Sequence, residues 1–300
     1  MILDRKIWAL ASGKGGTGKS VLAASMGAHL ADLGFRVVLV DADLGCANLH
    51  TNLGIEKPRA TLADFIERRT EHIEEVAIDT DIPRLRLISG ALDPVDAAHI
   101  RYQQKKRIMR QLNTLEADVV ILDLATGASL TEVELFCAAD TGALVMLPEP
   151  TSVENAYRLL RMLYFYMVRE IPGFKKLEKK LPPELNDNRV SPAAFLAEVE
   201  KLDEKWGQMI RKRMENFSPG LIINQVKTKE DRDLGPEARL VCKRFFGLDL
   251  PFLGAVEFDE SVWQSVRHKK PVILDYPHSR PSRSIRQLTE SMLSLSRRPT

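Results

Sequence analysis

A glycine-rich stretch, Gly13-Lys14-Gly15-Gly16-Thr17-Gly18-Lys19-Ser20, follows the apolar run Ile7–Ala11 and opens a helix-forming segment. It fits the pattern GxxxxGK[ST], whose glycines let backbone N–H groups surround phosphate oxygens at the positive end of a helix dipole. In this pattern Lys19 supplies a positive charge at the β- and γ-phosphates, and the hydroxyl of Ser20 is a ligand for Mg²⁺. Because the pattern needs a strand before it and a helix after it, it also fixes the start of the fold. The loop residues predicted to bind nucleotide are Gly13, Gly15, Gly16, Thr17, Gly18, Lys19, Ser20 and Val21.

Six further short apolar runs are spread along the chain. They are Val37–Val40, Leu85–Ile88, Val119–Leu122, Ala143–Leu147, Leu221–Ile223 and Leu250–Leu253. Several lack polar alternation, as is typical of parallel strands that are covered on both faces. Helical stretches lie between them, one of them expected to start from a capping box of Thr151 and Glu154. We therefore predict an α/β fold, a doubly wound and mostly parallel sheet flanked by helices, as a single domain over residues 1–300.

One region, residues 171–219, breaks the alternation of strands and helices. It holds the breakers Pro172-Gly173 and Pro182-Pro183, and Ser191-Pro192 then favours a helix start. Apolar residues from Phe195 to Phe217 recur at helical spacing. We predict a helical insertion whose apolar stripe packs on its own domain, with a partner-binding helix as the alternative.

Composition excludes several classes of protein. Of 300 residues 44% are apolar and 28% are charged, which is ordinary for a globular protein and unlike a disordered or collagen-like chain. We see neither a signal peptide nor an apolar run of about 20 residues that could cross a bilayer. The three cysteines lie far apart, which argues against a disulfide framework. Such cysteines are typical of a reducing compartment, and we expect a cytoplasmic protein. With a net charge of only +2, the whole molecule is not expected to be a general polyanion binder.

Acidic residues follow two of the predicted strands. Val37–Val40 leads into Asp41-Ala42-Asp43, and Val119–Leu122 leads into Asp123. Acids at strand ends beside a phosphate loop can hold a metal ion and orient an attacking water.

The second lysine of the loop, Lys14, points to a family. The segment from Lys14 to Ser20 reads KGGxGK[ST] and resembles the deviant Walker A ATPases of the MinD/ParA family. In that family this lysine reaches the nucleotide of the facing subunit, so that ATP holds two subunits together. The resemblance therefore implies that Lys14 contacts nucleotide and takes part in catalysis with Lys19.

The resemblance also implies roles for the acids. Asp43 corresponds to the residue that orients water, Asp41 to a secondary magnesium contact and Asp123 to the Walker B acid. Asn224, at the end of Leu221–Ile223, corresponds to an asparagine that contacts adenine. The sequence departs from the family pattern at Thr126, where alanine is usual, and at Glu257, where proline is usual.

Two segments, Asp43–Leu49 and Pro148–Ser152, are most similar to the MinD-like branch that includes the flagellar-number regulators FlhG and FleN. This resemblance implies a Mg²⁺-dependent ATP hydrolase, slow and stimulated by a partner. It would form a homodimer with ATP and a monomer with ADP, and it would control the position or number of a cellular structure. The activating or cargo protein is not identified by the sequence.

Three other functions stay open. The first is a ParA-like, DNA-associated partition ATPase. The second is an ATP-driven metal or cofactor loader, for which only Cys46 or Cys137 could supply a thiol pair across a dimer axis. The third is a scaffold that binds nucleotide without hydrolysis, against which Lys14, Asp43 and Asp123 argue together.

Docking surfaces are less clearly marked. The C-terminal segment 281–300 has a modest apolar stripe that includes Leu288 and Met292. We favour a closing helix there, and a membrane-bound helix, which would place the protein peripherally at a membrane or pole, is the alternative. Basic clusters occur at Arg101–Arg110, Arg211–Arg213 and Arg267–Lys270. We favour solvated faces for them, and contacts to DNA or an acidic partner are the alternative.

Overall fold

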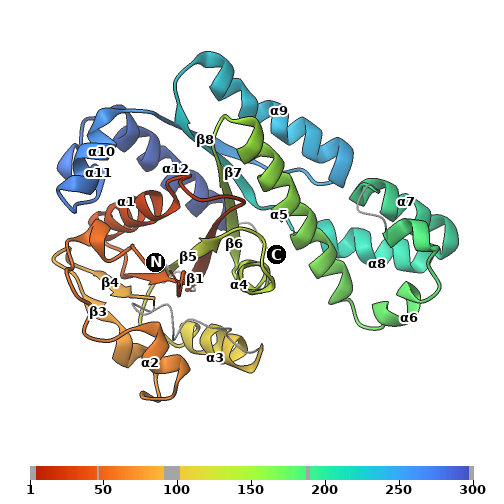
Figure 1. Cartoon of the computed structure of the whole chain (residues 1–300), viewed down its shortest axis with the longest axis horizontal. Coiled ribbons are helices and arrows are strands. Elements are labelled where there is room, and N and C mark those ends of the chain that lie inside the picture. The colour runs from red at the N-terminus through yellow and green to blue at the C-terminus, as the bar shows by residue number, and fades with distance from the viewer. Residues whose placement is uncertain (1–4, 46, 91–101, 187–189, 216, 297–300) are drawn as a thin grey trace.

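The computed structural model describes residues 5–45, 47–90, 102–186, 190–215 and 217–296. It contains one eight-stranded sheet in the order β3-β4-β2-β5-β1-β6-β7-β8 (Figure 1). Only β3 runs antiparallel to its neighbour, so the predicted mostly parallel sheet is confirmed. The strands are β1 (Lys6–Ser12), β2 (Val37–Asp41), β3 (Ile78–Asp79), β4 (Leu85–Ile88), β5 (Val119–Thr126), β6 (Thr141–Met146), β7 (Gly220–Val226) and β8 (Phe252–Glu257).

Helices cover both faces of the sheet and enclose two apolar cores (Figure 1). Side chains of a strand point alternately to opposite faces, so Ile7 and Ala9 enter one core while Trp8 and Leu10 enter the other. This double coverage explains why β1 lacks polar alternation. One face carries α1 (Lys19–Asp32), α10 (Glu260–Arg267), α11 (Val272–Asp275) and α12 (Arg280–Ser296). The other carries α2 (Leu62–Ile66), α3 (Tyr102–Leu112), α4 (Leu130–Ala138), α5 (Pro150–Arg169), α6 (Phe174–Glu178), α7 (Pro192–Leu202), α8 (Glu204–Glu215) and α9 (Lys229–Phe246).

Helix α5 begins differently from the expectation. Its N-cap is Glu149 and Pro150 occupies the first turn, so Thr151 lies inside the helix and the predicted capping box is wrong. Proline suits the first turn because its missing N–H would have no partner there. This earlier start matters for the site, because it puts the Glu149 side chain at the amino-terminal end of α5.

Helices α6, α7 and α8 fill most of the region that breaks the alternation. They lie along α5 at one end of the molecule (Figure 1). Phe195, Val199 and Ile210 are buried, and the ring of Phe195 meets Phe165 of α5 edge to face. The parent domain therefore covers part of the apolar stripe, whereas Leu202 and Met209 remain exposed. That the region is an insertion relative to the family stays a prediction.

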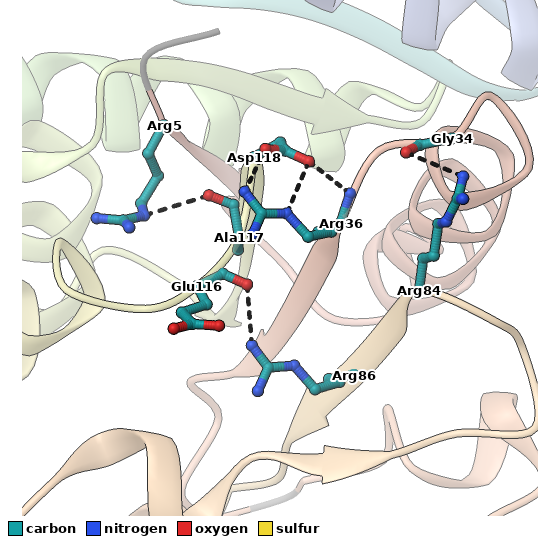
Figure 2. A network of polar contacts seen from close by, with 8 residues as sticks. All are labelled: Arg5, Gly34, Arg36, Arg84, Arg86, Glu116, Ala117 and Asp118. Carbon is teal, nitrogen blue, oxygen red and sulfur yellow. Dashed lines mark hydrogen bonds and ion pairs between the residues drawn. The ribbon is translucent and has the colours of Figure 1, made fainter. Parts of the chain in front are cut away.

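Arginine contacts tie together the amino-terminal ends of the strands (Figure 2). Asp118 accepts hydrogen bonds from the backbone N–H of Arg36 at 2.8 Å and from its Nη2 at 2.9 Å. Nearby, Arg5 donates to the carbonyl of Ala117 and Arg86 to that of Glu116. This edge holds β2 and β5 in register, which decides what meets at their opposite ends.

Candidate nucleotide-binding site

The glycine-rich loop connects β1 to α1 at the carboxyl edge of the sheet. Gly16 and Gly18 have φ of 77° and 86°, a left-handed backbone that favours glycine. Gly18 is the N-cap of α1 and Lys19 is its first residue. A Cβ on Gly13 would lie 2.3 Å from the carbonyl carbon and oxygen of Asn155. The loop thus passes directly against the backbone of α5, which only glycine allows at that point.

The end of β7 holds the same loop from another side. The Nδ2 of Asn224 donates to the carbonyl of Thr17 at 2.7 Å, and the Nε2 of Gln225 donates to that of Gly16 at 3.3 Å. A Cβ on Gly18 would lie 2.3 Å from the Asn224 amide nitrogen. Asn224 therefore positions the phosphate loop. Its contact with adenine stays a prediction, and the loop contact of Gln225 had no signal in the sequence.

A cavity of about 350 Å³ lies beside the loop. It brings together most of the predicted site residues, although Gly13, Lys14, Gly15 and Asn224 lie outside its lining. The lining residues are Gly16, Thr17, Gly18, Lys19, Ser20, Val21, Asp41, Asp43, Asn48, Asp123, Leu124 and Thr126. Asn48 had no predicted role, although it lies within the segment Asp43–Leu49 that carried the family resemblance.

Strand pairing places two of the acids side by side. Asp41 and Asp123 are partners in the register of β2 and β5, and both are buried. Burial raises the pKa of Asp41, and the neighbouring Asp123 raises it further. Burial also raises the pKa of Asp123, against the charge of Lys19 and a hydrogen bond from Ser20. Such a pair strongly favours a cation between or beside its members.

The residues present fit Mg²⁺. Among the described residues, the buried Oδ1 of Asp123 accepts no hydrogen bond. Ser20 lines the same cavity as this carboxylate. A hard cation prefers oxygen ligands of this kind, and a buried acceptor without a partner is otherwise costly.

Asp41 shapes the loop that follows β2. Its Oδ2 accepts the backbone N–H of Leu49 at 2.9 Å, and its Oδ1 accepts that of Asp43 at 3.1 Å. These bonds hold Asp43 at the cavity wall. A magnesium contact for Asp41 stays a prediction, as does the water-orienting role of Asp43.

Lys14 makes a contact that sequence reasoning missed. Its Nζ lies 2.6 Å from Oε2 of Glu149, at the N-cap of α5. Both side chains are partly exposed, at 29% and 51%. The lysine is thus held by its own chain, and its reach to a facing subunit stays a prediction.

Residues 8–272 match the model of the CobQ/CobB/MinD/ParA nucleotide binding domain. The chain belongs to this family. It is 27% identical over 289 residues to the antiactivator FleN of Pseudomonas aeruginosa, covering 96% of this chain and 86% of that protein. It is 31% identical over 182 residues to the septum site-determining protein MinD of Bacillus subtilis, covering 60% and 63%. The predicted MinD/ParA membership is confirmed, and with it a nucleotide-binding ATPase domain.

Solved structures of MinD proteins share the fold. MinD of Pyrococcus horikoshii, complexed with Mg-ADP, has a TM-score of 0.69 at 20% identity, with 98% of each chain covered. MinD of Aquifex aeolicus in its MinC:MinD complex has a TM-score of 0.62 at 19% identity, with 96% of each covered.

The other proposed surfaces are mostly occupied within the chain. In α3, Lys105 pairs with Glu134, and Arg107 donates to the carbonyls of Phe65 and Glu71. These cations fasten α3 to its own domain, whereas Arg101 lies outside the described residues. Helix α12 packs on α1 and β8, so its residues Ile285, Leu288 and Met292 are buried.

Two sequence hypotheses find little in the described residues. Burial raises the pKa of Cys137 to about 12, so its thiol is a poor metal ligand near neutral pH. Cys46 lies outside the described residues, and the described part of the chain holds no group of three metal-ligating side chains. Nor does any described helix have the length and apolar character needed to span a bilayer.

Proposed function

We propose that this protein is a Mg²⁺-dependent ATPase that acts as a switch between an ATP-bound homodimer and an ADP-bound monomer. Its output would be the position or number of a cellular structure. The observation that carries the proposal is that Lys19, Ser20, Asp43 and the buried Asp123 line one cavity beside the glycine-rich loop.

The residues of the cavity divide the chemistry between them. Backbone N–H groups of the loop and the start of α1 bind the phosphates, and Lys19 neutralises their charge. Ser20 and Asp123 would hold Mg²⁺, with Asp41 nearby, and the bound ion supplies charge stabilisation to the triphosphate. Asp43 accepts a hydrogen bond from the attacking water and orients it.

Lys14 links turnover to dimerisation in this proposal. In the single chain it is paired with Glu149, so it must leave that partner before it can reach the nucleotide of a second subunit. A low rate without a partner protein is the expected consequence. A partner protein would stimulate hydrolysis if it favoured contact of Lys14 with the nucleotide of the second subunit over its pairing with Glu149.

We expect the partner to be a protein whose activity this chain inhibits, because a relative that matches 96% of the chain is an antiactivator. We place the protein in the cytoplasm, with peripheral association at a membrane or pole. The DNA-associated alternative loses support because Lys105 and Arg107 are engaged within the domain.

Turnover and oligomer measurements test this function. Asp43→Ala should bind ATP, form the dimer on size exclusion and fail to release phosphate, because the water lacks its orienting carboxylate. Wild-type turnover in this variant would remove Asp43 from the mechanism. The trapped dimer is also the bait of choice for isolating the partner.

A further inference from the structure

Helix α10 carries exposed aromatic and basic side chains on one surface. The α10 surface consists of Phe258, Trp263, Val266, Arg267, Lys269 and Lys270, all of them exposed. Phe258 is 57% and Trp263 56% exposed. The other two tryptophans differ, because Trp8 is 0% exposed and Trp206 packs edge to face on Phe174.

The exposed side of α10 has no cover from the described part of its own chain. The opposite side of the helix faces the protein, since Ser265 is buried and Val262 packs against one of the apolar cores. Helical spacing of three and four residues sets Trp263, Val266 and Arg267 on one outward side of the helix, and Lys269 and Lys270 follow shortly after the helix ends at Arg267. In Figure 1, α10 lies with α11 beside α1 and α12, away from the helices α6–α8.

Cations accompany each exposed ring. The Nζ of Lys227 lies 4.6 Å from the centre of the Phe258 ring, and the Cζ of Arg267 lies 4.7 Å from that of Trp263. Within the described residues, neither Arg267 nor Lys270 forms an ion pair with a carboxylate. Lys269 lies 3.9 Å from Glu56, whose side chain is 87% exposed, and such a pair holds little energy.

The surface keeps an excess of positive charge. The acid on α10 is Glu260, in its first turn, and Asp259 caps the helix by accepting the N–H of Ser261. The whole chain carries a net charge of only +2. Positive charge is therefore gathered where the apolar rings are exposed, and its natural complement is a surface that is both anionic and able to admit rings.

We propose that the α10 surface docks on the headgroup region of an anionic lipid bilayer. Tryptophan and phenylalanine rings enter the boundary between headgroups and acyl chains. Arg267, Lys269 and Lys270 contact lipid phosphates, where each cation contributes to binding. A single-stranded nucleic acid would also take cations and rings, but the aliphatic Val266 offers no stacking face, so the bilayer is favoured.

Vesicle binding by the full chain tests the surface, with ATP and Mg²⁺ present and also with ADP. Vesicles of phosphatidylcholine mixed with phosphatidylglycerol should bind the protein, and vesicles of phosphatidylcholine alone should not. Binding should shift tryptophan emission to shorter wavelength. That shift reports on Trp263, since Trp8 is buried and Trp206 is partly buried against Phe174, and it should disappear in Trp263→Phe.

Matched variants give the test its control. The double variant Arg267→Glu/Lys270→Glu should lower binding to the mixed vesicles by about 25-fold or more, from about fivefold per lost cation. The same charge change on α9, Lys243→Glu/Arg244→Glu, should have little effect. Leu240 of α9, which is 69% exposed, provides the apolar control: Trp263→Ala should weaken binding roughly tenfold and Leu240→Ala should not.

Three results would overturn the assignment. The first is equal binding to neutral and anionic vesicles, or none to either with both nucleotides. The second is a change in Trp263 emission with single-stranded DNA and none with vesicles, which would make the surface a nucleic-acid site. The third is loss of the ATP-dependent dimer in Trp263→Ala without any vesicle binding by the wild type, which would assign the surface to a second copy.

Discussion

Removal of Lys14 should separate nucleotide binding from dimerisation. The structure allows the size of the effect to be bounded, because Lys14 already has a partner in Glu149 at 2.6 Å. With 29% and 51% of the two side chains exposed, that ion pair is worth no more than about 1 kcal/mol. A charge pair formed across a dimer interface, with water partly excluded, is worth about 2–5 kcal/mol.

Lys14→Ala loses the contact across the dimer and also the pair that holds the lysine in the monomer. The difference between these two pair energies leaves a net loss of about 1–5 kcal/mol in the free energy of dimerisation. This loss lowers the affinity of the dimer by about fivefold to several thousandfold. Glu149→Gln removes only the competing pair. It should strengthen the dimer, by at most about fivefold.

Light scattering or sedimentation with ATP and Mg²⁺ measures these changes. Each substitution is made in the Asp43→Ala background, so that ATP hydrolysis does not dissociate the dimer. A fluorescent ATP analogue should bind Asp43→Ala and Lys14→Ala/Asp43→Ala alike, while only the first should dimerise fully. If the double variant dimerises as well as its parent, Lys14 does not reach across and the family resemblance has misled us.

Three further changes test the site and the fold. Lys19→Ala should remove or severely weaken binding of the fluorescent ATP analogue, because the main counter-charge of the phosphates is gone; undiminished affinity would contradict the loop assignment. Gly13→Ala should lower the free energy of unfolding in urea by about 1–3 kcal/mol, since its Cβ meets the Asn155 backbone; the control Gly15→Ala, which has open space at its Cβ, should not. A hydrogen bond from Arg36 lowers the pKa of Asp118, so the carboxylate stabilises the fold above its unfolded pKa of about 3.9 and loses this effect as pH falls through the folded value. Asp118→Asn should therefore be less stable than wild type at neutral pH and converge with it in acid; a constant difference across pH would refute this.

Local pattern was enough to predict the phosphate loop, the order of strands and helices, and the acids near the carboxyl ends of β2 and β5, although β5 runs past Asp123 to Thr126. Loop conformation depends on glycines that are neighbours in sequence, and apolar runs without alternation have one stable place, the middle of a covered sheet. Short or polar elements escaped the prediction. Strand β3 has two residues and α10 mixes charges with an isolated tryptophan, so neither gives a periodic signal.

Contacts between distant residues could be decided only by the tertiary structure. Sequence spacing does not reveal that Asp41 faces Asp123, since their pairing depends on the register of two strands. The same holds for Asn224, which binds the loop at Thr17 although more than two hundred residues separate them in the sequence. It also holds for Lys14, whose partner Glu149 comes within reach only once the amino-terminal end of α5 has packed beside the loop.

Burial also decided what the basic and apolar stripes do. From sequence, the cations of α3 and the leucines of α12 could serve DNA or a membrane as well as the protein's own core. In the folded chain Arg107 meets backbone carbonyls and Leu288 is buried, whereas Trp263 stays exposed. Sequence determines which side chains are available for such contacts, and packing alone determines which of them remain free for a partner.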